Sequence, residues 1–219
     1  MSNDSYKSES ICAISSPPGI GGVSLIRISG PDSFSIVEKI FSKSLKDASG
    51  YQVLYGKIIE KKQIIDDVIV AVFKNPHSFT GENTVEINCH GSTFIQQKII
   101  ELLINNGARL ALPGEFSKRA FLNGKLDLSQ TEAIADLINS KSSAAHEIAI
   151  KQLKGGISSE LKILRNKLIE FASLIELELD FSEEDVEFAD RTHLNQLIQD
   201  LITHIDQLKK SFQYGNAIK

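Results

Sequence analysis

The sequence predicts an α+β protein in which a first part mixing short strands with helices is followed by an all-α second part. In the first part, apolar and polar residues alternate over short runs, which is typical of half-buried strands. Between Ser129 and Glu178 the apolar residues recur at every third or fourth position, which indicates amphipathic helix. The character changes near Gly114, and we place the boundary near residue 120. The predicted domains are residues 1–120 and 121–219.

Strands and helices of the first part are predicted from these runs. Short apolar or alternating stretches predict strands over residues 11–15, 23–28, 52–59, 64–73 and 83–89. The charged turn Glu60-Lys61-Lys62-Gln63 joins the third and fourth of them into a hairpin. Helical spacing predicts helices over residues 31–41 and 94–105, the second ended by Asn106-Gly107.

The second part is predicted to be helical throughout. Gly155-Gly156 interrupts the long apolar pattern, which indicates either two helices or one kinked helix. Ser182-Glu183-Glu184-Asp185 resembles a capping box. A further amphipathic helix is predicted over residues 194–212, ended at Tyr214-Gly215-Asn216.

Composition excludes several classes of protein. The chain is 42% hydrophobic and 24% charged, as in ordinary globular domains, and its net charge of −4 supplies no basic field for nucleic acid. The first ten residues are polar and do not form a signal peptide. No run approaches roughly 18 consecutive apolar residues, so we expect no membrane span and a cytoplasmic location.

The two cysteines, Cys12 and Cys89, lie in apolar strand-like runs and are expected to be buried thiols. A disulfide between them requires neighbouring strands. Because no Cys-x-x-Cys pair is present and the histidines have no ligand-like spacing, we predict no metal site.

The glycine-rich segment Gly19-Ile20-Gly21-Gly22 invites comparison with nucleotide-binding loops. A Walker loop ends in Gly-Lys-Ser/Thr, which is absent from this sequence. A dinucleotide fingerprint is followed by a helix, whereas a strand pattern follows here. We therefore predict a tight turn between two strands.

Polar residues inside the predicted strands are the candidate binding residues. Arg27 stands in an apolar alternating run, so it either lies at the surface or binds a carboxylate or carbonyl. Glu86 and Asn88 are two residues apart and share a strand face, where they either form a polar surface or bind a heterocycle with adjacent N–H donors. Glu82 and His90 bracket that strand, but two residues do not define an acid–base or metal site.

One long block resembles a known family. Pro113-Gly114-Glu115-Phe116-Ser117-Lys118-Arg119-Ala120-Phe121, continued by Leu122-Asn123-Gly124-Lys125-Leu126-Asp127-Leu128, resembles the signature of the MnmE/TrmE family, GTPases that help to modify the wobble uridine of transfer RNA. Further blocks follow the family's order. They are Pro-Pro-Gly-x-Gly-Gly-Val at 17–23, Ile-Arg-Ile-Ser-Gly at 26–30, Thr-Gly-Glu at 80–82, Val-Glu at 85–86, His-Gly at 90–91 and Asp-Phe-x-Glu-Glu-Asp at 180–185.

The resemblance implies a function that the residues alone do not. It implies an N-terminal domain similar to the folate-binding domain of the glycine-cleavage aminomethyltransferase, which forms a homodimer and binds 5-formyl- or methylene-tetrahydrofolate. With a MnmG/GidA-type flavoprotein, the parent protein is expected to modify the C5 position of the tRNA wobble uridine. The folate contacts of the family fall on Arg27, Glu86 and Lys125. No catalytic residue is assigned to this chain.

The sequence also departs from the family pattern. It contains no GTPase motif and ends where the family's GTPase domain begins, so GTP, Mg²⁺ and K⁺ are expected to bind only through that missing domain. We therefore interpret the chain as a partial protein that does not hydrolyse GTP. Two alternatives remain open, namely an aminomethyltransferase-like folate enzyme and a purely structural dimerisation module.

Overall fold

The computed structural model describes residues 9–45, 50–180, 192, 195–203 and 205–206. The chain divides into two compact units, Met1–Leu126 and Asp127–Lys219. The first contains a mixed sheet with helices and the second is helical, so the α+β fold class is confirmed. The predicted boundary at residue 120 lies inside helix α3 (Glu115–Leu122), which belongs to the first unit.

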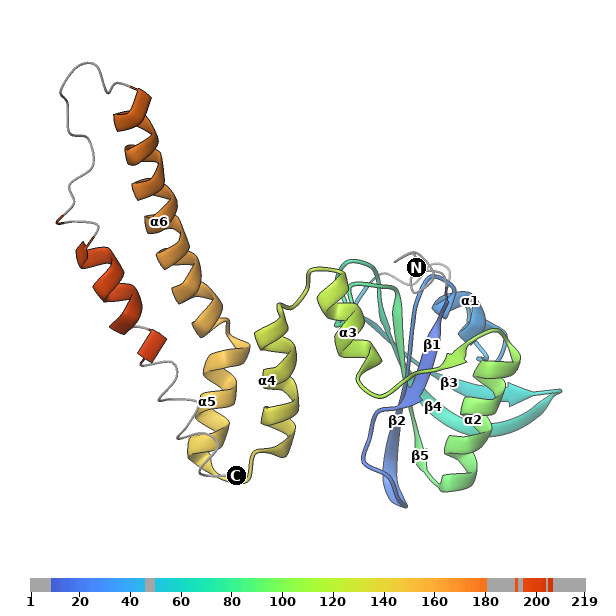
Figure 1. The fold of residues 1–219 in the computed structure, drawn as a ribbon. Coiled ribbons are helices and arrows are strands. Elements are labelled where there is room, and N and C mark those ends of the chain that lie inside the picture. Colours follow the sequence, from blue (N-terminus) through green and yellow to red (C-terminus); the bar gives the residue numbers. More distant parts are fainter. Residues whose placement is uncertain (1–8, 46–49, 181–191, 193–194, 204, 207–219) are drawn as a thin grey trace. The chain divides into compact units, whose positions relative to one another are not determined.

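The first unit is built on one six-stranded sheet with the order β3-β4-β5-β2-β1-β6 (Figure 1). Its strands are β1 (Ile11–Ile14), β2 (Gly21–Ser29), β3 (Gln52–Glu60), β4 (Gln63–Phe73), β5 (Thr84–Gly91) and β6 (Arg109–Leu110). All paired strands are antiparallel except β1 and β6. Strands β2 and β5 are therefore central, and residues on them are enclosed by neighbouring strands.

Two helices cover one face of this sheet. Helices α1 (Ser33–Glu38) and α2 (Thr93–Asn105) pack on the apolar side chains that alternate along the strands. This core includes Cys12, Ile26, Ile28, Ile58, Val68, Val70, Val72, Val85, Ile87, Cys89, Ile99, Leu102 and Leu103. The period of two places the intervening residues, among them Arg27 and Glu86, on the opposite face.

Most predicted elements of the first unit are confirmed to within a few residues. Lys61 and Lys62 both adopt positive φ, as a two-residue hairpin turn between β3 and β4 requires. The predicted helix 31–41 is shorter, because Phe41 instead pairs with Ile58 in an isolated bridge. The prediction did not include β6 or α3.

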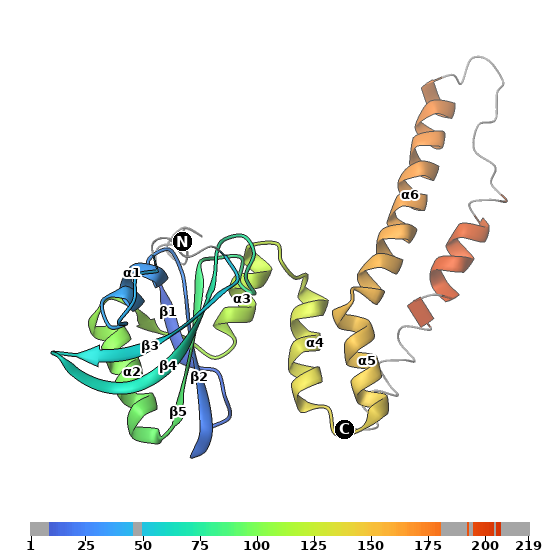
Figure 2. The ribbon, with the colours of Figure 1, turned by 180° about the vertical axis from the view of Figure 1, so that it is seen from behind.

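Residues 128–180 form three helices, whereas the sequence predicted two helices or one kinked helix there. They are α4 (Leu128–Asn139), α5 (Ser143–Leu153) and α6 (Gly156–Asp180), and α4 contacts α5 (Figure 2). The break between α4 and α5 was missed. Ser140 is extended, and the Ser142 side chain accepts a hydrogen bond from Ala145 N at 3.2 Å as the N-cap of α5. The predicted break at Gly155 is confirmed, since its φ of +78° ends α5.

Several predicted features of the second unit lie outside the described residues. They are the capping box at 182–185, most of the block at 180–185 and the helix end at 214–216. Residues 195–203 and 205–206, within the predicted helix 194–212, are helical. Among the helices that the structure describes, none has the length and apolarity needed to cross a bilayer.

Candidate functional site

Arg27 and Glu86 form an ion pair across the two central strands. They are direct partners in the register of β2 and β5. Arg27 Nε donates to Glu86 Oε1 at 2.8 Å, and Arg27 Nη2 lies 2.7 Å from the same oxygen. Their side chains are 23% and 22% exposed. Arg27 is therefore a half-buried residue of a central strand and not an edge arginine, and its carboxylate partner is Glu86.

Two aromatic rings from different segments flank the Arg27 guanidinium. Its central carbon lies 5.4 Å from the ring centroid of Phe79 and 5.5 Å from that of Phe116. Phe79 belongs to the loop between β4 and β5, and Phe116 lies in the first turn of α3. Both distances are within the range of cation–π attraction, so the guanidinium is held by the carboxylate and by two rings.

This pair leaves hydrogen-bonding capacity for a ligand. Both contacts of Arg27 end on Glu86 Oε1, and among the described residues Glu86 Oε2 accepts no hydrogen bond. Arg27 Nη1 likewise has no partner within the described parts of the chain. Asn88 lies on the same face as Glu86, two residues along β5. The site thus presents an acceptor, a donor and apolar rings to one planar ligand.

Lys125 does not contact Arg27 or Glu86. Its Nζ donates to Pro76 O at 3.1 Å, which ties it to the loop that carries Phe79. That loop passes close to the lysine stem, since a Cβ at Gly81 would lie 3.1 Å from Lys125 Cγ. With a φ of +77°, Gly81 also adopts a backbone conformation that side chains disfavour. Lys125 therefore packs beside the loop, in the space that a side chain at position 81 would occupy.

The structure separates Glu82 from His90. Glu82 accepts a hydrogen bond from Ser29 Oγ at 2.8 Å and pairs with Arg119. His90 Nδ1 lies 2.7 Å from Asp66 Oδ1, and its backbone N–H donates to Asp66 Oδ2 at 2.8 Å. Glu82 and His90 therefore have different partners in the described structure, and together they define no acid–base site. The described residues contain no group of three or more potential metal ligands.

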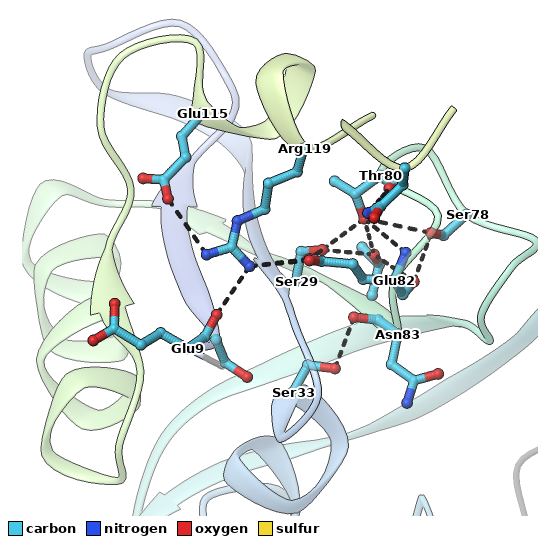
Figure 3. A network of polar contacts seen from close by, with 12 residues as sticks. Glu9, Ser29, Ser33, Ser78, Thr80, Glu82, Asn83, Glu115 and Arg119 are labelled. Atoms are coloured by element: carbon cyan, nitrogen blue, oxygen red, sulfur yellow. Dashed lines mark hydrogen bonds and ion pairs between the residues drawn. The ribbon is translucent and has the colours of Figure 1, made fainter. Parts of the chain in front are cut away.

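A buried ion network joins α3 to the loop before β5 (Figure 3). Arg119 and Glu115 lie one turn apart on α3, with side chains only 3% and 2% exposed. Arg119 Nη1 lies 3.2 and 3.1 Å from the two carboxylate oxygens of Glu82 and donates to Glu9 O at 2.9 Å. Arg119 Nη2 donates to Glu115 Oε1 at 3.3 Å.

Neutral hydrogen bonds extend this network to β2 and along the loop. Ser29 Oγ also lies 2.7 Å from Thr80 Oγ1, and Asn123 Nδ2 donates to Thr80 O at 2.8 Å. Ser78 Oγ donates to Glu82 O at 2.6 Å. The loop is therefore anchored both to the end of β2 and to the end of α3.

Glu115 is a strongly held carboxylate in this network. It accepts from Arg109 Nη2 at 2.6 Å, from Arg109 Nη1 at 3.1 Å and from Leu112 N at 2.8 Å. Burial by itself raises the pKa of Glu115, but these hydrogen bonds and the charges of Arg109 and Arg119 bring the pKa down to about 2. Glu115 is therefore ionised at neutral pH.

The cysteines and the glycine-rich loop carry no comparable chemistry. Cys12 and Cys89 are free, buried thiols on strands that β2 separates, which rules out a disulfide between them. Burial raises the pKa of both thiols to about 11. The glycine-rich loop connects β1 to β2, so a strand follows it as predicted.

Sequence reasoning identified Arg27 and Glu86 as separate candidates but did not pair them, and it did not assign Phe79, Phe116 and Arg119 to the site. Phe116 and Arg119 are three residues apart within one helix, so their spacing would have placed them on adjacent parts of one surface. No signal in the sequence places Phe79 over Arg27, because that contact depends on tertiary folding.

The fold and this site define a protein with an α+β unit bearing a charged, aromatic-flanked surface site, followed by a helical unit. Residues 10–125 match the family model described as the GTP-binding protein TrmE N-terminus. Residues 128–219 match the model described as the MnmE helical domain. The chain therefore belongs to the MnmE/TrmE family.

Several relatives of this chain are at least 50% identical to it over nearly its whole length. A tRNA modification GTPase MnmE from Parabacteroides distasonis is 55% identical over 216 residues, which is 95% of this chain and 47% of the relative. Proteins of the same name from Cytophaga hutchinsonii and Porphyromonas gingivalis are 53% and 50% identical, covering 96% and 98% of this chain and 46% of each relative. The chain thus spans about half the length of these relatives.

Proposed function

We propose that the α+β unit binds a reduced folate, 5-formyl- or methylene-tetrahydrofolate, through Arg27, Glu86 and Lys125. The observation that carries the proposal is the Arg27–Glu86 pair between Phe79 and Phe116, which leaves Glu86 Oε2 without a hydrogen bond in the described structure. A folate carries a flat pterin ring with adjacent N–H donors, and a carboxylate accepts from such a pair of donors.

Arg27 has two functions in this proposal. Through Nε and Nη2 it holds the carboxylate of Glu86 on the open face of the sheet, and its Nη1 remains available for a carbonyl or formyl oxygen. Lys125 suits a more distant anion, such as the glutamate tail. Its long stem is flexible, and a salt bridge to that tail would replace its single hydrogen bond to Pro76 O. When bound, the folate supplies a one-carbon unit.

The names of the relatives carry the second part of the proposal. We infer that this chain serves in a tRNA-modification GTPase that acts in the cytoplasm with a MnmG/GidA-type flavoprotein on C5 of the wobble uridine. In that protein, GTP, Mg²⁺ and K⁺ bind to a GTPase domain whose sequence motifs this chain does not contain. The chain's contribution is then to hold the folate, and tRNA contacts arise in the larger complex.

Exposed apolar residues on the same face of the sheet support the proposal of a homodimer. Tyr55 on β3 and Ile69 on β4 are cross-strand partners and are 63% and 46% exposed, and Val53 is 65% exposed. Ile69 in turn pairs with Asn88 of β5, so the apolar patch adjoins the face that carries Glu86. Large exposed apolar side chains gathered on one face are typical of protein interfaces.

The dimer is tested by sedimentation of the wild-type chain beside Tyr55→Asp. We expect a dimer that the charged side chain dissociates, because burying an unpaired carboxylate in an interface is costly. A monomeric wild-type chain, or a variant that dimerises as well as wild type, would contradict the proposed interface.

Folate binding is tested by calorimetric titration of 5-formyltetrahydrofolate into the chain. Loss of a hydrogen-bonded pair to a charged acceptor costs about 1.5–3 kcal/mol, so Glu86→Ala is expected to weaken binding by about 10- to 150-fold. Glu101→Ala is the matched control, because it removes a carboxylate from α2, which packs on the other face of the sheet. Circular dichroism of each variant checks that the fold is retained.

The outcomes distinguish an incorrect binding site from an absence of folate binding. Wild-type affinity in Glu86→Ala would show that the folate binds elsewhere. Absence of saturable binding to the wild-type chain would contradict folate binding by this unit and favour a purely dimerising function.

A further inference from the structure

The Arg27 site is assembled from three segments that are distant in the sequence. Strand β2 supplies Arg27, the loop between β4 and β5 supplies Phe79, and α3 supplies Phe116. Backbone pairing ties only the last residue of the loop to β2, since Asn83 O accepts a hydrogen bond from Gly30 N at 3.0 Å, and it does not reach Phe79 or α3. Some other contact must hold the two rings in position over the guanidinium.

The buried network supplies that contact, because it includes residues from each of the same three segments. Ser29 lies two residues after Arg27 on β2, Glu82 lies three residues after Phe79 in the loop, and Arg119 lies three residues after Phe116 on α3. Ser29 Oγ donates to Glu82 Oε2 at 2.8 Å, and Arg119 Nη1 lies 3.1 Å from that same oxygen. Glu82 therefore joins the strand to the helix.

Arg119 is the member on which the arrangement depends most. Its guanidinium lies between the carboxylates of Glu82 and Glu115, and its Nε has no hydrogen-bond partner among the described residues. Its position is thus determined by the acceptors around Nη1 and Nη2. A lysine in its place keeps the charge but cannot bond Glu82, Glu115 and Glu9 O from a rigid planar fork.

We propose that Arg119 is a positioning residue for the ligand site: by joining α3 to Glu82, it sets Phe116 and Phe79 over Arg27 and so controls ligand affinity without touching the ligand. Only the part of this proposal that concerns ligand affinity rests on the proposed folate-binding function. The placement of the rings over Arg27 is a property of the protein alone and is measured without ligand.

The test compares Arg119→Lys with wild type by two readouts. The first is the ¹H–¹⁵N NMR signal of Arg27 Nε–Hε, assigned by its loss in Arg27→Lys, because ring currents of the two flanking phenylalanines shift this proton. The second is the affinity for 5-formyltetrahydrofolate by calorimetry. We expect the Arg27 signal to move toward that of a solvent-exposed arginine and the affinity to fall about 10-fold, equivalent to about 1.4 kcal/mol.

Two further variants keep the test decisive. Ile99→Val removes one methylene from the fully buried core on the other face of the sheet and controls for lost stability. It is expected to change neither readout. Glu82→Gln keeps the size of the shared acceptor and removes its charge. We expect it to shift the Arg27 signal and lower the affinity in the same direction as Arg119→Lys, but by less. It replaces Arg119→Lys in the test if that variant does not fold.

The results distinguish the two proposals. An unchanged Arg27 signal in Arg119→Lys and Glu82→Gln would overturn the positioning function, whatever happens to affinity. A shifted signal with unchanged affinity would show that ring placement does not control binding and would also overturn it. If wild type binds no folate while the Arg27 signal still shifts, the folate proposal fails and the placement of the rings by Arg119 stands.

Discussion

The two units of this chain bury their apolar residues to very different extents. In the first, strands and helices enclose a continuous core in which Ile26, Ile58, Ile87, Ile99 and Leu103 are fully buried. In the second, α6 is 25 residues long, yet Leu161, Ile163, Leu168, Ile169 and Ile175 along it are all at least 38% exposed. The first unit is therefore stabilised mainly by long-range packing, whereas long-range packing buries less apolar surface in the described part of the second unit.

The largest expected effect is a cavity in the first core. Leu103→Ala in α2 should lower the free energy of unfolding by about 2–5 kcal/mol, because a fully buried leucine leaves a cavity that the sheet and α2 cannot fill. Ile163→Ala in α6, where the side chain is 57% exposed, should cost less than about 1 kcal/mol. Urea unfolding followed by circular dichroism measures both. Equal losses for the two variants would contradict the difference between the units.

The next effect is the response of the first unit to acid. The pKa of Glu115 is about 2 in the folded protein and about 4.5 when unfolded. Because the folded pKa is the lower one, the stabilisation is fully present above pH 4.5 and is lost as pH falls toward 2. A shift of this size corresponds to roughly 3 kcal/mol.

The pH effect is measured by urea unfolding at pH 6 and pH 3. Glu115→Gln should lose less stability between these pH values than wild type, although it starts from a lower value because it breaks the contacts with Arg109 and Arg119. Hydrogen exchange read by mass spectrometry should place the acid response in residues 9–126. A variant with the same pH dependence as wild type would show that other carboxyl groups determine the response.

The smallest effect concerns a local signal in the second unit. Asp127 caps α4, accepting from Gln130 N at 2.8 Å while Gln130 Oε1 accepts from Asp127 N at 2.9 Å. Asp127→Ala should cost about 1 kcal/mol and increase hydrogen exchange in α4. Strands of the first unit should exchange as in wild type. Faster exchange across the sheet would mean that the two units do not respond independently.

Local patterns predicted much of this fold. The alternation along residues 23–28 and 64–73 predicted β2 and β4, because one face of each strand packs against helices. The helix end at Gly107 was predicted because its positive φ favours glycine, and the turn at Lys61-Lys62 was predicted because charged residues separate two strand patterns. Strand β6 was missed because two residues carry no period, and the Ser140–Ser142 break was missed because its capping serine was not recognised.

The candidate site was only partly predictable. Arg27 was a candidate because a charged residue in an apolar strand needs a partner or solvent. Glu86 was a candidate because it shares a strand face with Asn88, where the two can bind a heterocycle. Their pairing depends on β2 lying next to β5 in one particular register, which no local pattern in either strand specifies. The folate contacts at Arg27, Glu86 and Lys125 stay a prediction until binding is measured.

By itself, the sequence determined most of the strands and helices, which face of each is apolar, and which family the chain resembles, because these depend on residues that are close in the chain. Only the tertiary structure decided that Glu86 lies opposite Arg27, that Phe79 and Phe116 flank the guanidinium, and that Glu82 pairs with Arg119 and not with His90. These contacts join residues that are tens of positions apart. Their geometry is set by strand order and by burial of the whole core, which are properties of the complete fold.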